Sequence, residues 1–204
     1  QTKRNYRLSE ILITPKHEEW LTATADFTAN TINNWQFAYK GVHYLLGFWT
    51  RLVSDLPYLK IDTDIGQAFF DKVIPLICQN VITARINTLN NNVEDDSLEE
   101  FFSAGNMHLE LTHLPILFRY QYNTTVLYLK QHLLPTIDQY KSALSQCESL
   151  SNGNNNNNMI KEIQLIECQL ATYIYNIGAI IGYQKSRHLN DVELDASLCT
   201  WFFQ

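Results

Sequence analysis

The segment that decides the fold is WQFAYKGVHYLLGFWTRLVSDLPYLK, which covers residues 35–60. It closes one apolar helix, turns, and continues in a second helix that ends at Pro57. In the second helix, apolar residues recur at offsets of three and four, which places them on one helical face: Val42, Leu45, Leu46, Trp49, Leu52, Val53 and Leu56. Such a face needs a partner layer. The opposite face can stay in water and carries Lys40, Thr50, Arg51 and Asp55.

The same periodicity predicts helices along most of the chain. Pro15, preceded by Thr14 as N-cap, starts a helix to about Asn33 whose buried face holds Trp20, Thr24, Phe27 and Thr31. Asp62 or Asp64 starts another, in which Pro75 predicts a kink or break. The remaining predicted helices cover about 98–103, 107–122 (interrupted by Pro115), 124–147 (interrupted by Pro135), a face from Ile163 to Ile181, and 192–203.

Two polar stretches separate these helices. Residues 87–96 form a connection rich in Asn and acids, and the Asn-rich tract 151–158 is predicted to be a disordered loop. Sustained period-two alternation bounded by hairpin turns does not occur in the sequence, so the fold class is all-α, with about seven or eight helices. Antiparallel helix pairs repeating at about 40 residues would form a HEAT-like α-solenoid, and a plain helical bundle fits the periodicity equally well.

Composition narrows the function classes. The net charge of −6, with only 15 Lys and Arg spread along 204 residues, argues against nucleic acid as a partner. An uninterrupted apolar run of about 18 residues is missing, so we expect no membrane insertion. Cys78, Cys147, Cys168 and Cys199 stand far apart, which favours reduced thiols in the cytosol or nucleus. The start at Gln1 and the apolar end at 201–203 favour a piece of a larger structure.

Three short motifs in the sequence are similar to metal-binding, calcium-binding or catalytic motifs, but none of them matches the arrangement of residues that such a site needs. His108 and His113 flank Glu110, but two histidines five positions apart point about 140° away from each other around a helix, which argues against a metal site. Residues 62–66 resemble the first positions of a calcium-binding loop, but the Glu that such a loop carries at its twelfth position is missing. Helix capping therefore explains Asp62 and Asp64. His43, Ser54 and Asp55 lie on or near one helix, but a hydrolase would need its serine on a strand-turn nucleophile elbow, and the G-x-S-x-G motif of that elbow does not occur in the sequence. We therefore predict no catalytic residue, metal or cofactor, and no enzyme.

Two further features of the sequence concern helix packing and partner binding. Gly178 and Gly182 have G-x-x-x-G spacing, which predicts close helix packing inside the fold and a destabilising effect of Gly178→Leu. An acidic cluster is either a solvated loop between helices or a patch that attracts basic protein surface; its members are Glu94, Asp95, Asp96, Glu99 and Glu100.

Three segments, at 5–11, 35–60 and 173–182, carry a family resemblance in matching order. Within the second, the matching residues are 35–38, 42–46, Trp49, 51–53 and 57–60. They resemble the exportin-7 family, also called Ran-binding proteins 16 and 17, which are nuclear transport receptors of the importin-β superfamily. The resemblance covers nearly all of 1–204 with gaps and is weakest at 87–105 and 149–158.

The resemblance implies that 1–204 is a central HEAT-like segment of a longer exportin, and so decides for the solenoid over the bundle. It implies a receptor that binds protein cargo together with Ran in its GTP form, contacts nucleoporins and shuttles between nucleus and cytoplasm. The segment would supply scaffold and part of the inner surface, and the acidic cluster at 94–100 would face the basic side of Ran. The alternative is a helical scaffold or adaptor that is not linked to Ran.

Overall fold

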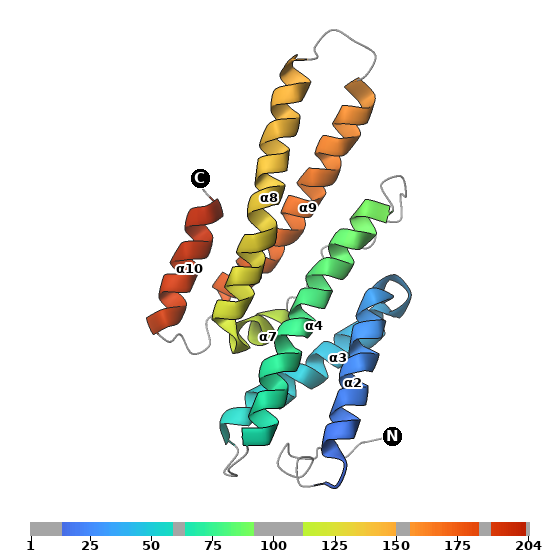
Figure 1. The fold of residues 1–204 in the computed structure, drawn as a ribbon, viewed down its shortest axis with the longest axis vertical. Coiled ribbons are helices and arrows are strands. Elements are labelled where there is room, and N and C mark those ends of the chain that lie inside the picture. The colour runs from blue at the N-terminus through green and yellow to red at the C-terminus, as the bar shows by residue number, and fades with distance from the viewer. Residues whose placement is uncertain (1–13, 59–63, 92–111, 150–155, 184–188, 203–204) are drawn as a thin grey trace.

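A computed structural model describes residues 14–58, 64–91, 112–149, 156–183 and 189–202. In these ranges the chain is helical and contains no strand, which confirms the all-α prediction (Figure 1). The elements are α2 (His17–Asn33), α3 (Trp35–Asp55), the 3₁₀ turn η1 (Leu56–Tyr58), α4 (Asp64–Asn91), α7 (Leu114–Tyr120), α8 (Tyr122–Ser149), α9 (Asn156–Gly182) and α10 (Leu189–Phe202).

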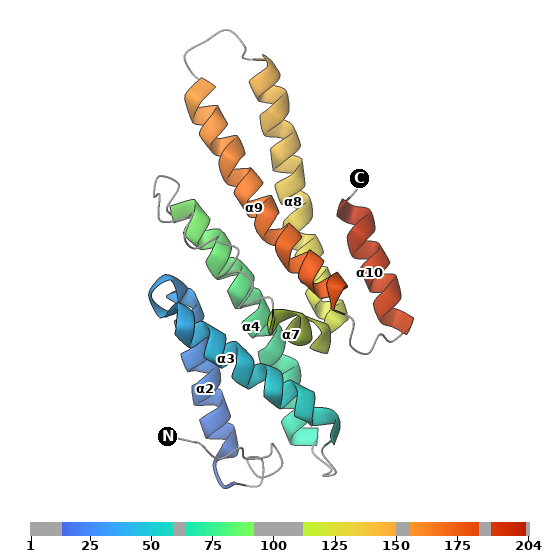
Figure 2. The ribbon, with the colours of Figure 1, turned by 180° about the vertical axis from the view of Figure 1, so that it is seen from behind.

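The helices form two layers. In the first layer α2 packs on α4, α4 on α8 and α8 on α10, and all four run in the same direction (Figure 1). In the second layer α3 packs on α7 and α7 on α9, and α3 and α9 run the opposite way (Figure 2). Contacts of α2 with α3, α4 with α7 and α8 with α9 join the layers. Antiparallel helix pairs stacked side by side are an α-solenoid, as predicted from the resemblance.

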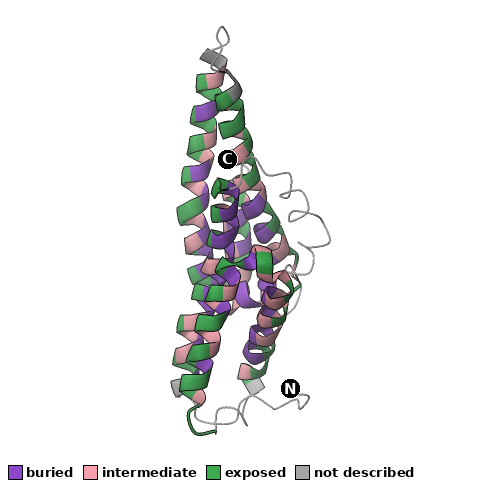
Figure 3. Cartoon of the chain, turned by 90° about the vertical axis from the view of Figure 1, so that its right-hand side faces the viewer, coloured by how far each residue is buried: buried purple, intermediate pink, exposed green. Residues whose placement is uncertain are grey.

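The first three helices enclose a dense apolar core. Trp49 is completely buried, and its indole N–H donates to the Thr28 hydroxyl on α2 at 2.9 Å. Its ring lies edge-on to Phe70 of α4, with the centroids 6.4 Å apart. Residues coloured as buried are concentrated along the middle of the molecule where the layers meet (Figure 3). The periodic segment quoted first therefore does supply the face that meets the partner layer.

The burial of α2 differs from the sequence prediction. Its buried residues are Leu21, Thr28 and Ile32, whereas Trp20 is 48% exposed and Phe27 62% exposed. Both stripes have helical spacing, and the positions of α3 and α4 decide which one is covered. The helix also begins at His17, two residues after Pro15, with Lys16 rather than Thr14 at the N-cap position.

A second difference concerns α3. Thr50 was expected on the wet face but is only 8% exposed, because α7 packs against that side of the helix. The Thr50 hydroxyl donates to the His113 carbonyl, just before α7, at 3.4 Å. The apolar stripe predicted the side of α3 that meets α2 and α4, and it could not reveal that α7 contacts another side.

The structure shows no break at Pro75 or Pro135. Pro75 lies inside a continuous α4 and Pro135 inside a continuous α8, whereas Pro115 sits in the first turn of α7. A first-turn proline loses no intrahelical bond, and one missing bond in a 28-residue helix is tolerated when neighbouring helices hold both halves. The helix predicted at 98–103 lies outside the described residues.

Two observed helix ends also differ from the predicted ones. α4 continues to Asn91, into the predicted polar connection, and α9 begins at Asn156, so the last three residues of the predicted loop 151–158 are helical. Asn is well suited to a helix start, because its side chain can satisfy exposed backbone N–H groups there. The rest of that loop lies outside the described residues.

α9 is the most apolar long helix that the structure describes. By length and composition alone, Asn158–Gly182 could cross a membrane, contrary to the expectation from apolar runs. In the fold, 33% of the most apolar 18-residue window of this stretch is buried, and α9 packs on α8, α4 and α7. A helix that packs against several neighbours needs the same apolar composition. Gly178 and Gly182 are exposed, and a Cβ at either would meet nothing within 4 Å, so the predicted close packing at these glycines is wrong.

Candidate partner-binding surface

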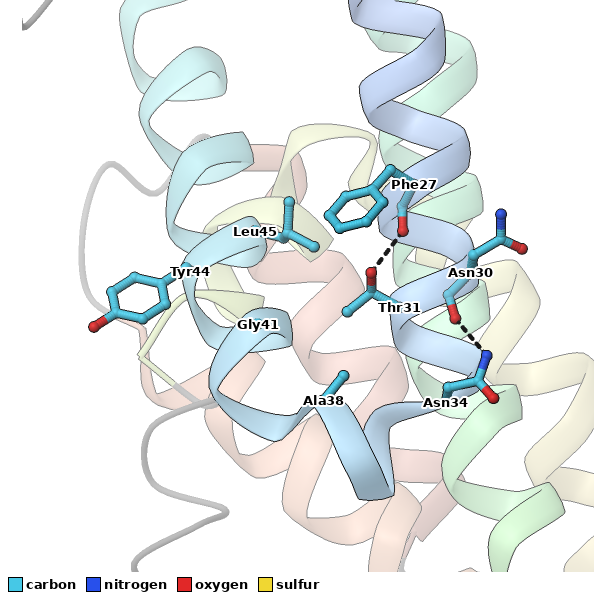
Figure 4. Close-up of a pocket in the computed structure, with 8 residues that line it drawn as sticks. All are labelled: Phe27, Asn30, Thr31, Asn34, Ala38, Gly41, Tyr44 and Leu45. Atoms are coloured by element: carbon cyan, nitrogen blue, oxygen red, sulfur yellow. Dashed lines mark hydrogen bonds between the residues drawn. The ribbon is translucent and has the colours of Figure 1, made fainter. Parts of the chain in front are cut away.

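An open apolar groove of about 570 Å³ runs between α2 and α3 (Figure 4). It is lined by Phe27, Asn30, Thr31, Asn34, Ala38, Gly41, Tyr44 and Leu45. The Phe27 ring points from α2 toward Leu45 of α3, whereas Tyr44 points away from α2. The groove therefore has apolar walls contributed by two helices and an aromatic side chain at its outer edge.

The local sequence explains why the groove is apolar although several polar residues line it. The Thr31 hydroxyl donates to the Phe27 carbonyl at 2.7 Å, and the Asn34 side-chain amide donates to the Asn30 carbonyl at 2.9 Å. These donors are satisfied within their own helix end and do not point across the groove. At Ala38, which lines the groove, the backbone leaves the helical region (φ −121°, ψ 24°), so α3 is kinked after its first turn.

Aromatic side chains are exposed around this groove. Tyr44 is 75% exposed and Phe27 is 62% exposed. Exposed aromatic side chains beside a concave apolar surface are typical of protein-binding sites, because they bury a large area at low cost in conformational entropy. The lining contains no ionisable side chain other than the Tyr44 phenol, so the surface suits recognition rather than chemistry.

The structure does not place the acidic cluster, because Glu94, Asp95, Asp96, Glu99 and Glu100 all lie outside the described residues. His108 and Glu110 also lie outside them. In the described part of the chain, no group of three or more His, Cys, Asp or Glu side chains could hold a metal ion.

His113 precedes α7 and lies against α3. Its ring centroid is 4.9 Å from that of His43, and burial together with the nearby His43 lowers the pKa of His113 below its usual 6.5. Ser54 and Asp55 are exposed on α3. Burial thus favours the neutral form of the His113 imidazole.

The strongest polar site is the corner between α7 and α8, at 119–122, which sequence reasoning missed. On one side Asp71 of α4 accepts hydrogen bonds from the Tyr120 hydroxyl (2.7 Å), the Gln121 amide (3.0 Å) and the Gln67 amide (3.0 Å). Burial alone would raise the pKa of Asp71, but these three bonds together lower it below its usual 3.8.

On the other side of the corner, Asp195 of α10 is paired with Arg119. The guanidinium Nη2 donates to both carboxylate oxygens, at 2.8 and 3.0 Å, and the Tyr122 hydroxyl donates to the same carboxylate. Burial and this bond raise the pKa of the Tyr122 hydroxyl. The four consecutive residues thus connect two aspartates on different helices. No spacing rule links positions 71, 119–122 and 195, so sequence patterns carried no signal for this arrangement.

Comparison with known proteins gives a consistent picture. Residues 86–204 match the family described as exportin-7-like, TPR domain. Similar proteins include exportin-7-B of Xenopus laevis (29% identical over 90% of this chain and 16% of that protein) and Ran-binding protein 16 of Drosophila melanogaster (31% over 88% and 15%). Exportin-7 of Dictyostelium discoideum is 25% identical over 88% of this chain and 16% of that protein. No solved structure matches the chain.

These matches fit the fold in the structure. The chain spans about a sixth of the length of the curated relatives it matches. TPR repeats, which the family description names, are stacked antiparallel helix pairs, as HEAT repeats are. A TPR repeat usually has about 34 residues and a HEAT repeat about 40–47 residues. The pair formed by α8 (28 residues) and α9 (27 residues) is longer than either repeat. On the family match, which covers more than half of its residues, the chain belongs to the exportin-7-like family.

Proposed function

We propose that this chain is a segment of a nuclear transport receptor. It binds protein cargo cooperatively with Ran in its GTP form and carries the cargo through the nuclear pore, in contact with nucleoporins, between nucleus and cytoplasm. The observation that carries the proposal is the family match over 86–204, supported by relatives named exportin-7 and Ran-binding protein 16. The segment contributes scaffold and part of the inner surface, and no reaction is assigned to it.

The solenoid suits this function physically. Each helix pair contacts only its neighbours, so the stack can change curvature around a partner without losing its core. If cargo and Ran-GTP favour the same curvature, each increases the affinity for the other by the same factor. The receptor then needs no catalytic group, because GTP hydrolysis on Ran changes which curvature is favoured.

The direct test is the nucleotide dependence of binding. We expect the whole protein that contains this chain, immobilised, to bind Ran loaded with GTP at least about tenfold more tightly than Ran loaded with GDP, a difference of about 1.4 kcal/mol. The rival function, a helical adaptor not linked to Ran, predicts equal binding of the two forms. Equal affinities, or no Ran binding in the whole protein, would favour the adaptor.

The acidic cluster at 94–100 is proposed as a contact for basic protein surface, with Ran as the partner. Reversing the charge of Glu94, Asp95, Asp96, Glu99 and Glu100 should weaken Ran-GTP binding, and more so at low salt, where exposed charges are least screened. A matched control reverses the exposed acids Glu18, Glu19 and Asp26 of α2. Unchanged affinity of the cluster variant in low salt would remove this contact from the proposal.

We assign the groove between α2 and α3 to protein cargo. The exposed rings of Phe27 and Tyr44 are the support for this assignment, because such side chains dominate binding energy at protein interfaces. A photo-reactive phenylalanine at Phe27 should cross-link to cargo only when Ran-GTP is present. The same group at Leu127, an exposed residue of α8, is the control, and equal cross-linking at both positions would contradict the assignment.

A further inference from the structure

α10 is attached to the rest of the fold differently from the other long helices. Its main packing partner is α8. Among its described side chains only Leu198 and Asp195 are buried, whereas α3 buries seven. Trp201 adds a half-buried contact with Lys130 of α8, whose ammonium lies 4.7 Å from the ring centroid. Leu198 belongs to the core, with Leu194 and Trp201 packed against it, so apolar burial holds α10 through fewer side chains than it holds α3.

The remaining attachment is electrostatic and converges on Arg119. This side chain is only 7% exposed and makes the bidentate pair with Asp195 described above. Its Nη1 also lies 3.5 Å from a carboxylate oxygen of Asp191, one turn earlier on α10. Its Nε donates to the Ile180 carbonyl at 2.9 Å, near the end of α9, and its guanidinium lies 4.6 Å from the centre of the Tyr122 ring. One cation thus joins α7, α8, α9 and α10.

We infer that α10 is a separately opening segment, and that the Arg119–Asp195 pair is the latch that holds it closed. A buried ion pair loses its hydration on closing and regains it on opening, so its net contribution is small while it is intact. Removing Arg119 leaves Asp195 without a cation, and removing Asp195 leaves the buried Arg119 with only its longer pair to Asp191, so either change favours the open state. Segments with few buried apolar contacts open locally at free energies well below that of global unfolding.

The second aspartate of the corner provides a matched comparison. Asp71 also accepts three hydrogen bonds, but all its donors are neutral, and α4 is held by the buried side chains Phe70, Ile74 and Ile77. Loss of the Asp71 charge should therefore leave α4 closed. The consequence for the solenoid is that the angle of its last described helix is set by one ion pair, and can change while α2–α4 remain intact.

Amide hydrogen exchange of the 204-residue chain tests the latch. In Asp195→Asn and Arg119→Gln we expect exchange in 191–202 to rise on the order of 100-fold, with α3 unchanged. Asp71→Asn should leave the exchange of α10 unchanged. The double variant Arg119→Met with Asp195→Leu should restore protection relative to the single variants, because it replaces the buried pair with apolar side chains and leaves without its cation only Asp191, which is the more exposed of the two aspartates.

The wild-type chain gives a second measurement that does not depend on the variants folding. At low denaturant its α10 amides should exchange through an opening that α3 does not share. The inference is overturned if α10 and α3 exchange at the same rate at every denaturant concentration, if both accelerate together in Asp195→Asn, or if the double variant stays as unprotected as the single ones.

Discussion

The two ends of the described fold are held together by different physical interactions. At α2–α4, Trp49, Phe70, Leu46 and Ile74 are completely buried in one apolar core. Among the described side chains of α10, those buried are one aspartate and one leucine, and the aspartate is matched by Arg119. Apolar packing is non-directional and increases with area, so α2–α4 should resist distortion as a block. Ion pairs and hydrogen bonds depend on geometry, so a small displacement of α10 weakens its attachment.

This difference suits a pliable scaffold. A solenoid that adapts to partners needs blocks that stay folded and joints that can change. In this chain the apolar block contains the exposed groove assigned to cargo, and the polar corner at 119–122 forms the joint.

The largest expected effect tests the apolar block. Trp49→Ala should lower the free energy of unfolding by about 3–5 kcal/mol, since it removes a fully buried ring and leaves a cavity. Urea denaturation measures the change. Trp20→Ala is the control, because Trp20 is about half exposed, and its loss should be well below half that of Trp49→Ala. Similar losses for both variants would mean that Trp49 is not central to the core.

The next effect tests the polar corner. Tyr122→Phe removes the hydroxyl that donates to Asp195 and should cost about 1–2 kcal/mol, because a buried carboxylate loses one donor but keeps Arg119. Tyr120→Phe, on the more exposed Asp71 side, should cost less. Thermal denaturation of the two variants gives the comparison. A larger loss of stability for Tyr120→Phe would contradict the prediction that the Asp195 side of the corner contributes more to stability than the Asp71 side.

A smaller effect corrects the expectation for α9. Gly178→Ala should stabilise the chain by about 0.5–1 kcal/mol, because alanine favours the helix and a Cβ there meets open space. Gly47→Ala is the contrasting variant, since its Cβ would lie 3.2 Å from Nε2 of His113 and gain less or lose stability. Destabilisation by Gly178→Ala would instead support a packed partner on this face of α9.

The smallest effect is a pH dependence. The pKa of His113 is lowered in the folded chain, so the unfolded chain binds more protons as pH falls through about 6.5, and stability should decrease from pH 7.5 to 5.5. His113→Asn should reduce this slope relative to wild type. Urea midpoints at several pH values measure it. An identical slope in the variant would mean that burial and the nearby His43 do not lower the pKa of His113 in the folded chain.

Sequence patterns predicted α3, α10 and most of the inward face of α9, because apolar residues at helical spacing report burial on one side. Within the predicted face from Ile163 to Ile181, Ile166, Tyr173 and Ile177 are buried, while Ile174 is 46% exposed. Patterns failed where two stripes compete, as on α2, and where a third helix covers a polar side, as at Thr50. The candidate groove was not predicted, since it depends on how α2 and α3 diverge at Ala38.

From the order of its residues alone, the chain is all-α, and its family is recognisable, because helical periodicity and shared segments are local properties of the sequence. Tertiary structure alone decided which of two apolar faces on α2 is covered, that Pro75 and Pro135 do not break their helices, and that Asp71 and Asp195 meet one corner. Those outcomes depend on contacts between residues far apart in the chain, and such contacts leave no periodic trace in the sequence.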